Sequence, residues 1–224
     1  QRENRRAWVK QMLSEMDADD TPGLGAHPLA LALEVQKVMR PEDWLVIDGG
    51  NTHFWSEIAI NIAGSQGQEL GGILHPGSFS MLGVGVSFAL AAKLRHPQGH
   101  AVVISGDGAF LSGGLSIEAA FQEGLPITVV IDNNGGLTTI SQQQERLFET
   151  PRHVATDFRD IPFHKMFEGL GGYGERVERA EDIAPAVKRA LASGKTACVD
   201  VRTRGVISPI VAAVTSKRDK ASIE

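Results

Sequence analysis

Short apolar runs alternate along most of the chain with segments whose apolar residues recur at helical spacing. The runs predict strands at 43–50, 100–108, 127–134, near Val177 and at 197–204. The periodic segments predict helices from Pro28 and over about 53–63, 83–95, 114–123, 159–169 and 181–193. The runs VVIS, ITVVI and ACVDV are almost continuously apolar, which is typical of strands covered on both faces. The pattern therefore predicts an α/β fold with a doubly wound, mostly parallel sheet and helices on both faces, and a polar loop after Asn134.

Polar segments flank this alternating region. Residues 1–27 begin with a polar helix and continue into a loop rich in Pro, Gly and Asp, so we expect a linker arm there. The region 28–204 is expected to be one α/β domain and 205–224 a C-terminal tail. The first residue is Gln rather than Met and the opening lacks a signal-peptide pattern, so the start is expected to be processed or truncated.

The composition favours a folded protein and disfavours nucleic-acid-binding and membrane-spanning classes. The chain has 224 residues, 42% of them hydrophobic and 22% charged, which is ordinary for a folded protein. Its formal net charge is −5, so nucleic acid is not an expected partner. No stretch reaches the roughly 20 apolar residues of a membrane span. The single cysteine, Cys198, cannot form an internal disulfide, and we expect a cytoplasmic protein without a membrane partner.

Glycines and polar residues follow three of the predicted strands. They are Asp48-Gly49-Gly50, Gly106-Asp107-Gly108 and Asn133-Asn134-Gly135-Gly136. Ligands bind beyond the carboxyl ends of the strands in doubly wound sheets, so chemistry is expected at these positions. The 24 residues 109–132 have the length of one helix and one strand, which brings Asp107 and Asn134 to one edge of the sheet. A carboxylate, an amide oxygen and a free carbonyl suit Mg²⁺ when phosphate oxygens complete its shell.

The combined pattern, GDG followed by about two dozen residues and then NN, resembles the signature of thiamine-diphosphate-dependent enzymes in the domain that binds the cofactor's diphosphate. The resemblance implies that the side chains of Asp107 and Asn134 and the carbonyl of Gly136 bind Mg²⁺. The residues that it places around the diphosphate are Gly106, Gly108 and Ala109.

Two further segments extend the resemblance. In DGGNTHFW, Gly50, Asn51 and Thr52 match the turn that contacts the diphosphate in the acetolactate synthase group. The run SFSMLGVGVSFALAAKL matches the family stretch usually written GAMGFGLPAAIGA. There the resemblance implies that the carbonyl of Ser80 is an acceptor for the aminopyrimidine and that Leu82 is the catalytic wedge that bends the cofactor. The bend brings the 4′-imino nitrogen beside the thiazolium C2–H group.

The run GGLTTISQQQERLFE also looks like the acetolactate synthase pattern, with departures. Thr138 and Thr139 stand near its Gly-Met pair, and Gln143 stands where Trp is common. These departures favour other members of that branch. We therefore expect a lyase or carboligase that breaks or forms C–C bonds next to a carbonyl in 2-hydroxyacyl-CoA or 2-oxo acid substrates. The alternatives are an acetolactate synthase-type transferase and a non-catalytic cofactor-binding subunit of a split enzyme.

The resemblance also implies a partner. In this family the aminopyrimidine is activated by a glutamate from a separate pyrimidine-binding domain, normally across a dimer interface. We expect such a domain or subunit to complete the site in a homo- or hetero-oligomer, and we expect this chain to be a fragment of a longer polypeptide. A nicotinamide-dependent oxidoreductase is disfavoured because DGGNTHFW lacks a glycine fingerprint.

Four features have a structural as well as a functional interpretation. His53 and His75 could exchange protons with a substrate or could be ordinary surface and loop residues. Asp48 could contact the cofactor, but a role in shaping its turn is favoured. The segment GLGGYG at 169–174 is interpreted as a helix C-cap, because it follows a helix rather than a strand.

Overall fold

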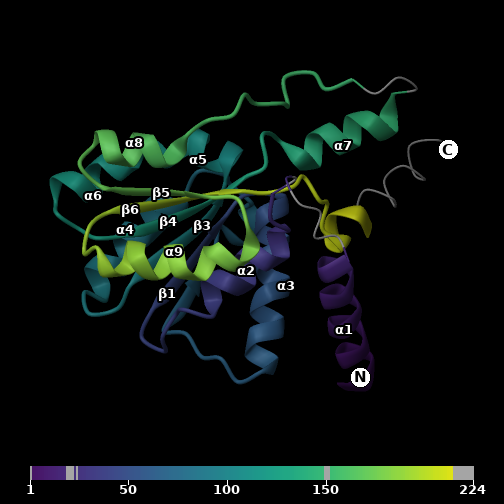
Figure 1. The fold of residues 1–224 in the computed structure, drawn as a ribbon, viewed down its shortest axis with the longest axis horizontal. Coiled ribbons are helices and arrows are strands. Elements are labelled where there is room, and N and C mark those ends of the chain that lie inside the picture. The colour runs from purple at the N-terminus through teal and green to yellow at the C-terminus, as the bar shows by residue number, and fades with distance from the viewer. Residues whose placement is uncertain (1, 19–22, 24, 149–151, 214–224) are drawn as a thin grey trace.

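A six-stranded parallel sheet forms the centre of the computed structural model, which describes residues 2–18, 23, 25–148 and 152–213 (Figure 1). Its strands are β1 (Trp44–Asp48), β2 (Gly72–Leu74), β3 (Ala101–Gly106), β4 (Thr128–Asn133), β5 (Tyr173–Val177) and β6 (Ala197–Arg202). They lie in the order β2-β1-β3-β4-β6-β5, and each neighbouring pair is parallel. The predicted α/β fold with a doubly wound parallel sheet is confirmed.

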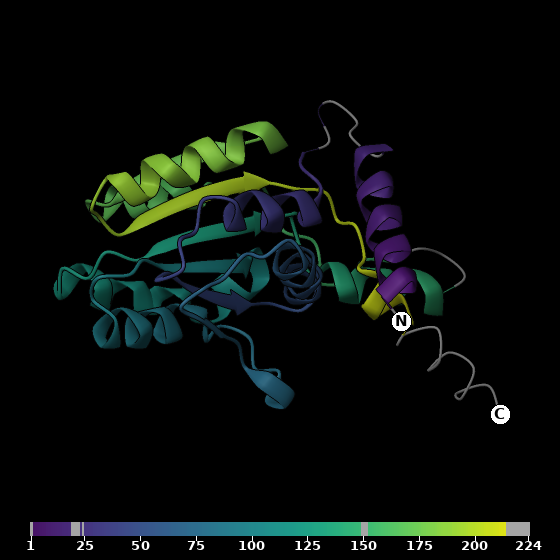
Figure 2. The same cartoon turned by 90° about the horizontal axis from the view of Figure 1, so that it is seen from below.

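Helices cover both faces of the sheet (Figures 1 and 2). One face packs against α2 (Pro28–Gln36), α3 (Asn51–Ser65) and α9 (Ala180–Ala192). The other packs against α4 (Gly85–Arg95), α6 (Glu118–Gln122) and α8 (Phe163–Gly169). The other helical elements are α1 (Arg2–Ala18), α5 (Asp107–Gly113), α7 (Thr138–Leu147), and the 3₁₀ turns η1 (Gly77–Phe79) and η2 (Gly114–Ile117). In the described part of the chain, no helix has both the length and the apolar character needed to cross a membrane.

The central strands are apolar throughout because each contributes to two cores. Every residue of β3 and β4 is buried. Successive side chains of a strand point to opposite faces, so Val102 and Ile104 join the core that contains α2, α3 and α9. Val103 joins the other core, with Phe110 and Phe163. Because helices cover both faces, these strands lack the apolar–polar alternation of a strand with one exposed face.

The polar stretch after Asn134 contains a helix, where only a loop was expected. Helix α7 begins there, and its buried positions include Thr138 and Ser141. Because these buried side chains are polar, the stretch lacks the apolar periodicity by which the other helices are recognised. The predicted loop is therefore wrong over Thr138–Leu147, and the helix brings its first turn to the carboxyl edge of the sheet.

Other element boundaries also differ from the expectation. The helix predicted at 159–169 begins at Phe163. Helix α5 begins at Asp107, directly after β3 and ahead of the helix predicted at 114–123. The Gly-rich stretch after α3 contains the short strand β2. The GLGGYG segment caps α8 as predicted, since the N–H of Gly172 donates to a carbonyl of that helix at 2.8 Å.

Contacts cross both expected boundaries of the central domain. Met12 of α1 is buried in the core that contains α2 and α9. Ala26 forms a parallel bridge with Thr203 beyond the end of β6, and Ser208 is fully buried. The division into linker arm, domain and tail stays a prediction, and most of the expected tail, 214–224, lies outside the described residues.

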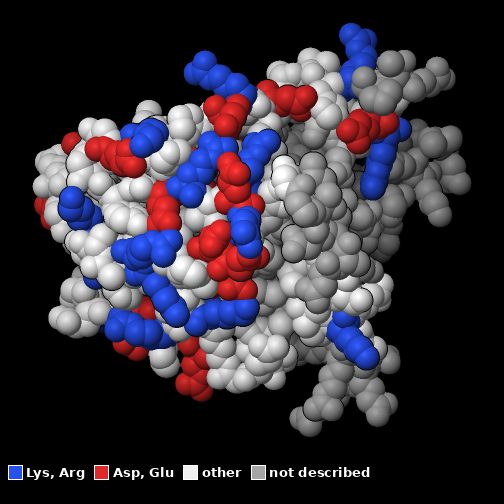
Figure 3. Space-filling view, in the orientation of Figure 1, with Lys and Arg blue, Asp and Glu red and all other residues white. Residues whose placement is uncertain are grey.

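Ion pairs follow the β5 edge of the sheet. Arg176 in β5 pairs with Asp160 at 2.9 Å, and Arg189 of α9 pairs with Glu175 in β5. Figure 3 shows positive and negative side chains interspersed on this face of the molecule. Charged side chains at an edge strand disfavour pairing with a strand of another chain.

The order of the strands determines where a ligand site can form. From β1 the chain passes to β2 on one side and then to β3 on the other, so the direction of winding changes between β1 and β3. Doubly wound folds bind ligands at the carboxyl ends of the strands on either side of such a point. The turns after β1 and β3 carry Gly50 and Asp107.

Candidate functional site

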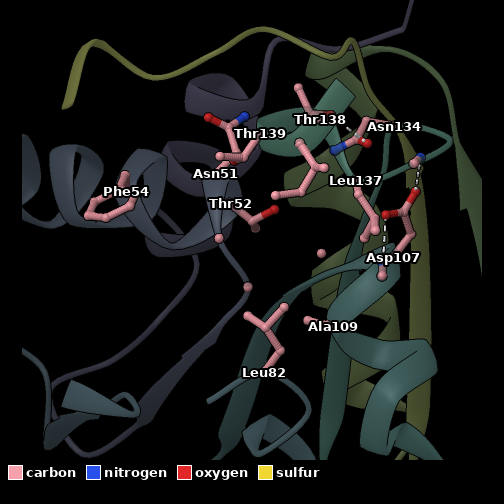
Figure 4. A pocket seen from close by; sticks show the side chains of 16 residues that line it. Asn51, Thr52, Phe54, Leu82, Asp107, Ala109, Asn134, Leu137, Thr138 and Thr139 are labelled. Atoms are coloured by element: carbon pink, nitrogen blue, oxygen red, sulfur yellow. Dashed lines mark hydrogen bonds between the residues drawn. The ribbon is translucent and has the colours of Figure 1, made fainter. Parts of the chain in front are cut away.

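A cavity of about 200 Å³ lies beyond the carboxyl ends of β1, β3 and β4 (Figure 4). Every predicted site residue except Ser80 lines it: Gly50, Asn51, Thr52, Leu82, Gly106, Asp107, Gly108, Ala109, Asn134 and Gly136. The start of α7 contributes Leu137, Thr138, Thr139 and Ile140. The fold therefore brings together residues from four separate segments of the sequence.

Asp107 joins two of these segments. It is the first residue of α5, and its side chain is 2% exposed. Its Oδ1 atom accepts a hydrogen bond from the N–H of Gly108 at 2.6 Å, and Oδ2 accepts from Gly135 and Gly136 at 2.8 and 3.0 Å. Burial raises the pKa of Asp107 to about 7, with a further contribution from the negative charge of Asp132, although the three N–H donors oppose the change.

Asp132 in β4 is a second buried carboxylate, and sequence reasoning missed it. Its Oδ2 atom accepts a hydrogen bond from the hydroxyl of Thr52 at 2.6 Å, and its Oδ1 atom accepts one from the hydroxyl of Thr203. Burial raises the pKa of Asp132. In the sequence this residue is only the polar end of the apolar run ITVVID, and its threonine partners are far away along the chain. The hydroxyl of Thr52, predicted at the cofactor, therefore donates to a carboxylate.

Thr138 holds two of the oxygens that were predicted to bind Mg²⁺. Its hydroxyl donates to Oδ1 of Asn134 at 2.9 Å, and its N–H donates to the carbonyl of Gly136 at 3.0 Å. Each acceptor oxygen keeps a second lone pair that can bind a cation. The third predicted ligand, Asp107, is hydrogen-bonded to the N–H of Gly136. In the sequence, Thr138 is only a departure from the family pattern, whereas in the structure it holds the oxygens of Asn134 and Gly136 in place.

The lining of the cavity fits a diphosphate held by a divalent cation. Asp107 is the only ionisable side chain among the described lining residues. Backbone approaches closely there, since a Cβ atom on Gly136 would overlap the carbonyl of Thr156. Helices α3 and α7 both begin at the cavity without a side-chain cap, and the positive ends of their dipoles favour an anion there.

The donor set also decides how a metal ion could be held. Within the described residues, no group of three or more His, Cys, Asp or Glu could hold a metal ion. One carboxylate, the amide oxygen of Asn134 and the carbonyl of Gly136 are hard donors of the kind that Mg²⁺ accepts when phosphate oxygens and water supply the rest. The residues present therefore fit Mg²⁺ bound together with a diphosphate.

Asn51 lines the cavity, but its side chain is bound elsewhere. Its Nδ2 atom donates to the carbonyl of Val206 and its Oδ1 atom accepts from the N–H of Ser208, both at 2.7 Å. Gly50, which precedes it, is the N-cap residue of α3. The predicted contact of Asn51 with the cofactor stays a prediction, and the bonds that its amide group makes are to the chain after β6.

The loop that carries Leu82 is held by Asp48 at the end of β1. The two carboxylate oxygens of Asp48 accept hydrogen bonds from the N–H groups of Gly83 and Gly85 at 3.1 and 2.8 Å. Burial raises the pKa of Asp48. These contacts agree with the structural interpretation of Asp48. In Figure 4, Leu82 lies on the opposite side of the cavity from Asn51 and Thr139.

Three other candidates lie away from the cavity. Ser80 follows η1 with a φ angle of 51° and is exposed, on a turn that projects from the body in Figure 2. Its role at the aminopyrimidine stays a prediction. The ring of His53 lies 5.3 Å from that of His75 and also contacts Glu57 at 3.0 Å. Neither histidine is among the described residues that line the cavity.

Comparison with known families gives one match over most of the chain. The family model described as thiamine pyrophosphate enzyme, C-terminal TPP binding domain, matches residues 48–201. This range contains the GDG and NN segments, strands β2 to β5 and all of β6 except its last residue.

Similar proteins include enzymes of two kinds. A probable acetolactate synthase from Mycobacterium bovis is 32% identical over 179 residues, and 2-hydroxyacyl-CoA lyase 2 from Mus musculus is 30% identical over 177 residues. These alignments cover 79% and 78% of this chain but only 31% and 26% of the two relatives.

A solved structure has the same fold. The thiamine diphosphate-dependent 4-hydroxybenzoylformate decarboxylase from Rhodococcus jostii RHA1 is similar with a TM-score of 0.69 and 26% sequence identity. The similar region covers 82% of this chain and 34% of that one. The chain therefore spans about a third or less of the length of the proteins that it matches.

Proposed function

The chain belongs to the thiamine pyrophosphate enzyme family, as a C-terminal cofactor-binding domain, and from this premise we propose that its cavity binds thiamine diphosphate together with Mg²⁺. The observation that carries the proposal is the position of Asp107. This buried carboxylate joins the GDG turn to the NN loop and is the only ionisable group among the described residues that line the cavity.

The cation would be held by the carboxylate of Asp107, the amide oxygen of Asn134 and the carbonyl of Gly136. Two carboxylates, Asp107 and Asp132, are buried close enough for the charge of one to raise the pKa of the other. A divalent cation would favour the ionised form of Asp107 and so offset this repulsion. The N-terminal ends of α3 and α7 would face the diphosphate.

We propose that the complete enzyme is a lyase or carboligase that breaks or forms a C–C bond next to a carbonyl. Bound thiamine diphosphate supplies the nucleophilic carbon and the electron sink for such a reaction. Leu82 would press against the cofactor and keep it bent, and Asp48 would keep the Leu82 loop in place through Gly83 and Gly85. The residues of this chain thus bind and orient the cofactor.

The proposed substrates are 2-hydroxyacyl-CoA thioesters or 2-oxo acids. Two observations support this range. The relatives are named as an acetolactate synthase, a 2-hydroxyacyl-CoA lyase and a 4-hydroxybenzoylformate decarboxylase. The cavity is lined by Thr138 and Thr139 where the acetolactate synthase pattern has Gly and Met, which favours another member of that branch.

A second domain or subunit is part of the proposal. The chain spans about a third or less of its relatives, and Asp107 is the only acidic side chain among the described residues of the cavity. We propose that a pyrimidine-binding domain supplies the activating glutamate in a homo- or hetero-oligomer, and that the enzyme works in the cytoplasm. The buried, unpaired Cys198 is compatible with a reducing compartment.

The test is calorimetric titration of the complete enzyme with thiamine diphosphate in Mg²⁺ and in EDTA. We expect binding that needs Mg²⁺ and that Asp107→Ala weakens by at least about a hundredfold, because the variant loses the charged ligand. Asp160→Ala is the matched control, because this exposed carboxylate pairs with Arg176 in the edge strand β5. Strand β6 separates β5 from β4, the nearest strand that ends at the cavity. Unchanged affinity in Asp107→Ala would refute the proposed metal site.

A further inference from the structure

The hydroxyl of Thr139 is a polar atom of the cavity that the proposed function leaves without a role. Its Oγ1 atom is buried and has no hydrogen-bond partner among the described residues. Thr139 itself lines the cavity in the first turn of α7. Burying a hydroxyl without a partner costs free energy, because the hydrogen bonds to water are lost and none replaces them. A bound ligand would therefore have to supply the missing partner of this hydroxyl.

The surroundings of Thr139 favour an anionic oxygen. A Cβ atom on Gly50 would lie 3.6 Å from Oγ1 of Thr139, so the hydroxyl faces the turn that begins α3. Neither α3 nor α7 has a side-chain cap at its first turn. The positive ends of the two helix dipoles favour negative charge between them, and the unpaired hydroxyl adds a donor at the same place.

The contacts of Thr138 indicate at which end of the cavity Thr139 lies. Thr138 is hydrogen-bonded to Asn134 and Gly136, two of the proposed metal ligands, so the backbone of Thr139 adjoins the residue that holds the metal end of the cavity. Leu82, the proposed wedge under the cofactor rings, lies on the opposite side (Figure 4). An anionic group close to the cation and remote from the rings is a phosphate of the cofactor rather than a substrate.

We propose that the hydroxyl of Thr139 donates a hydrogen bond to a phosphate oxygen of the bound diphosphate. This inference rests on the proposed function and adds a side-chain donor to the backbone N–H groups of the site. A hydroxyl bonded to a charged oxygen forms a stronger hydrogen bond than a neutral pair does. Thr139 would thereby recognise the diphosphate rather than the thiazolium or the aminopyrimidine.

The experiment compares Thr139→Val with Thr139→Ser in the complete enzyme. Val keeps the shape of Thr and removes the hydroxyl, whereas Ser keeps the hydroxyl. Calorimetry in Mg²⁺ with inorganic pyrophosphate, thiamine diphosphate and unphosphorylated thiamine separates the two ends of the cofactor. We expect Thr139→Val to weaken the binding of pyrophosphate and thiamine diphosphate by roughly tenfold or more, to leave the affinity for thiamine unchanged, and Thr139→Ser to bind as the wild type does.

Ser56→Ala is the matched control. The hydroxyl of Ser56 is also buried without a partner, but Ser56 does not line the cavity among the described residues. Both Thr139→Val and Ser56→Ala should keep or raise the unfolding temperature of the ligand-free protein, because each removes an unpaired buried hydroxyl. Only Thr139→Val should lose affinity for pyrophosphate.

Two results would overturn the inference alone: wild-type affinity for pyrophosphate in Thr139→Val, or an equal loss of affinity for thiamine. Failure of the wild-type enzyme to bind either phosphate ligand in Mg²⁺ would instead refute the proposed function, and the inference with it. The wild-type titration therefore distinguishes the two kinds of failure.

Discussion

Asn51 and Ser208, which are 157 residues apart in the sequence, are joined by a hydrogen bond of 2.7 Å between Oδ1 of Asn51 and the N–H of Ser208. The same side chain donates to the carbonyl of Val206, which also accepts from the indole N–H of Trp55 at 2.9 Å. The first turn of α3 is thus connected to the chain after β6. Because Gly50 begins this turn, the contact fixes one wall of the cavity.

Asn51→Ala should therefore lower stability more than it lowers cofactor affinity. The variant loses two hydrogen bonds and leaves the buried N–H of Ser208 without its acceptor, which should reduce the free energy of unfolding by about 2–4 kcal/mol. Urea unfolding of the ligand-free protein measures this change. Asn51→Asp keeps the acceptor for Ser208 but turns an oxygen toward the carbonyl of Val206, so it should not restore the stability of the wild type. A variant of wild-type stability that binds thiamine diphosphate poorly would contradict this role and favour direct contact with the cofactor.

Leu82→Ala should separate catalysis from binding. Leu82 is 41% exposed, so its truncation should change the free energy of unfolding by less than about 1 kcal/mol. Loss of the proposed wedge should lower kcat by roughly tenfold or more while the affinity for thiamine diphosphate stays within about threefold of the wild type. Leu94→Ala is the control, since Leu94 is equally apolar and 66% exposed but lies on α4 outside the lining. An unchanged kcat in Leu82→Ala would exclude the wedge.

Asp48→Ala should loosen the loop that carries Leu82. It leaves the N–H groups of Gly83 and Gly85 without their acceptor, so we expect a loss of about 2–4 kcal/mol in stability together with a lower kcat. Asp48→Asn keeps one acceptor oxygen and should fall between the wild type and Asp48→Ala in both measurements. Urea unfolding and steady-state kinetics test this order, and a full kcat in Asp48→Ala would show that the loop does not need this anchor.

The apolar pattern was sufficient to predict five of the six strands in the described part of the chain and most of the helices, because the central strands, covered on both faces, are almost continuously apolar. The GDG and NN segments were found because each follows such a strand, and parallel strands bring their carboxyl ends to one edge. The same reasoning placed Asp107 next to the loop of Asn134 and Gly136, and the hydrogen bonds from Asp107 to that loop confirm this proximity.

Contacts between polar residues that are far apart in the sequence could not be predicted from the apolar pattern. Asp132 lies in a fully buried strand, and its partners Thr52 and Thr203 are 80 and 71 residues away. Helix α7 is hidden because its buried positions are polar. Such residues are specified by the neighbours that the fold supplies rather than by local periodicity, so only the structure reveals them.

Thr138→Val should weaken the metal site through its neighbours. The hydroxyl of Thr138 donates to Oδ1 of Asn134, and its removal takes away a contact that orients the amide oxygen toward the cation. We expect the Mg²⁺ concentration needed for cofactor binding to rise by about tenfold or more, and Thr138→Ser to restore it. Fluorescence titration with Mg²⁺ at saturating thiamine diphosphate measures this. Equal Mg²⁺ requirements in the three proteins would mean that Asn134 needs no such support.

The raised pKa of Asp107 predicts how the stability of the ligand-free protein depends on pH. The pKa of Asp107 is about 7 in the folded protein, compared with an ordinary value of 3.8. Between pH 3.8 and about pH 7, folding therefore takes up a proton. The free energy of unfolding consequently falls as the pH rises through this range. The loss should be roughly 3 kcal/mol between about pH 5 and about pH 8. Above the folded pKa it should stay constant.

The difference in free energy of unfolding between the wild type and Asp107→Asn isolates this effect, because all other groups titrate in both proteins. The altered hydrogen bond to Gly108 changes this difference by an amount that does not depend on pH. In EDTA, urea unfolding should show the wild type losing stability relative to Asp107→Asn as the pH rises. Saturating Mg²⁺ with thiamine diphosphate should reverse the trend, because a cation bound to Asp107 favours its ionised form. Parallel stability curves in EDTA would mean that Asp107 is already ionised in the empty site, and that its neighbouring N–H donors outweigh burial and the charge of Asp132.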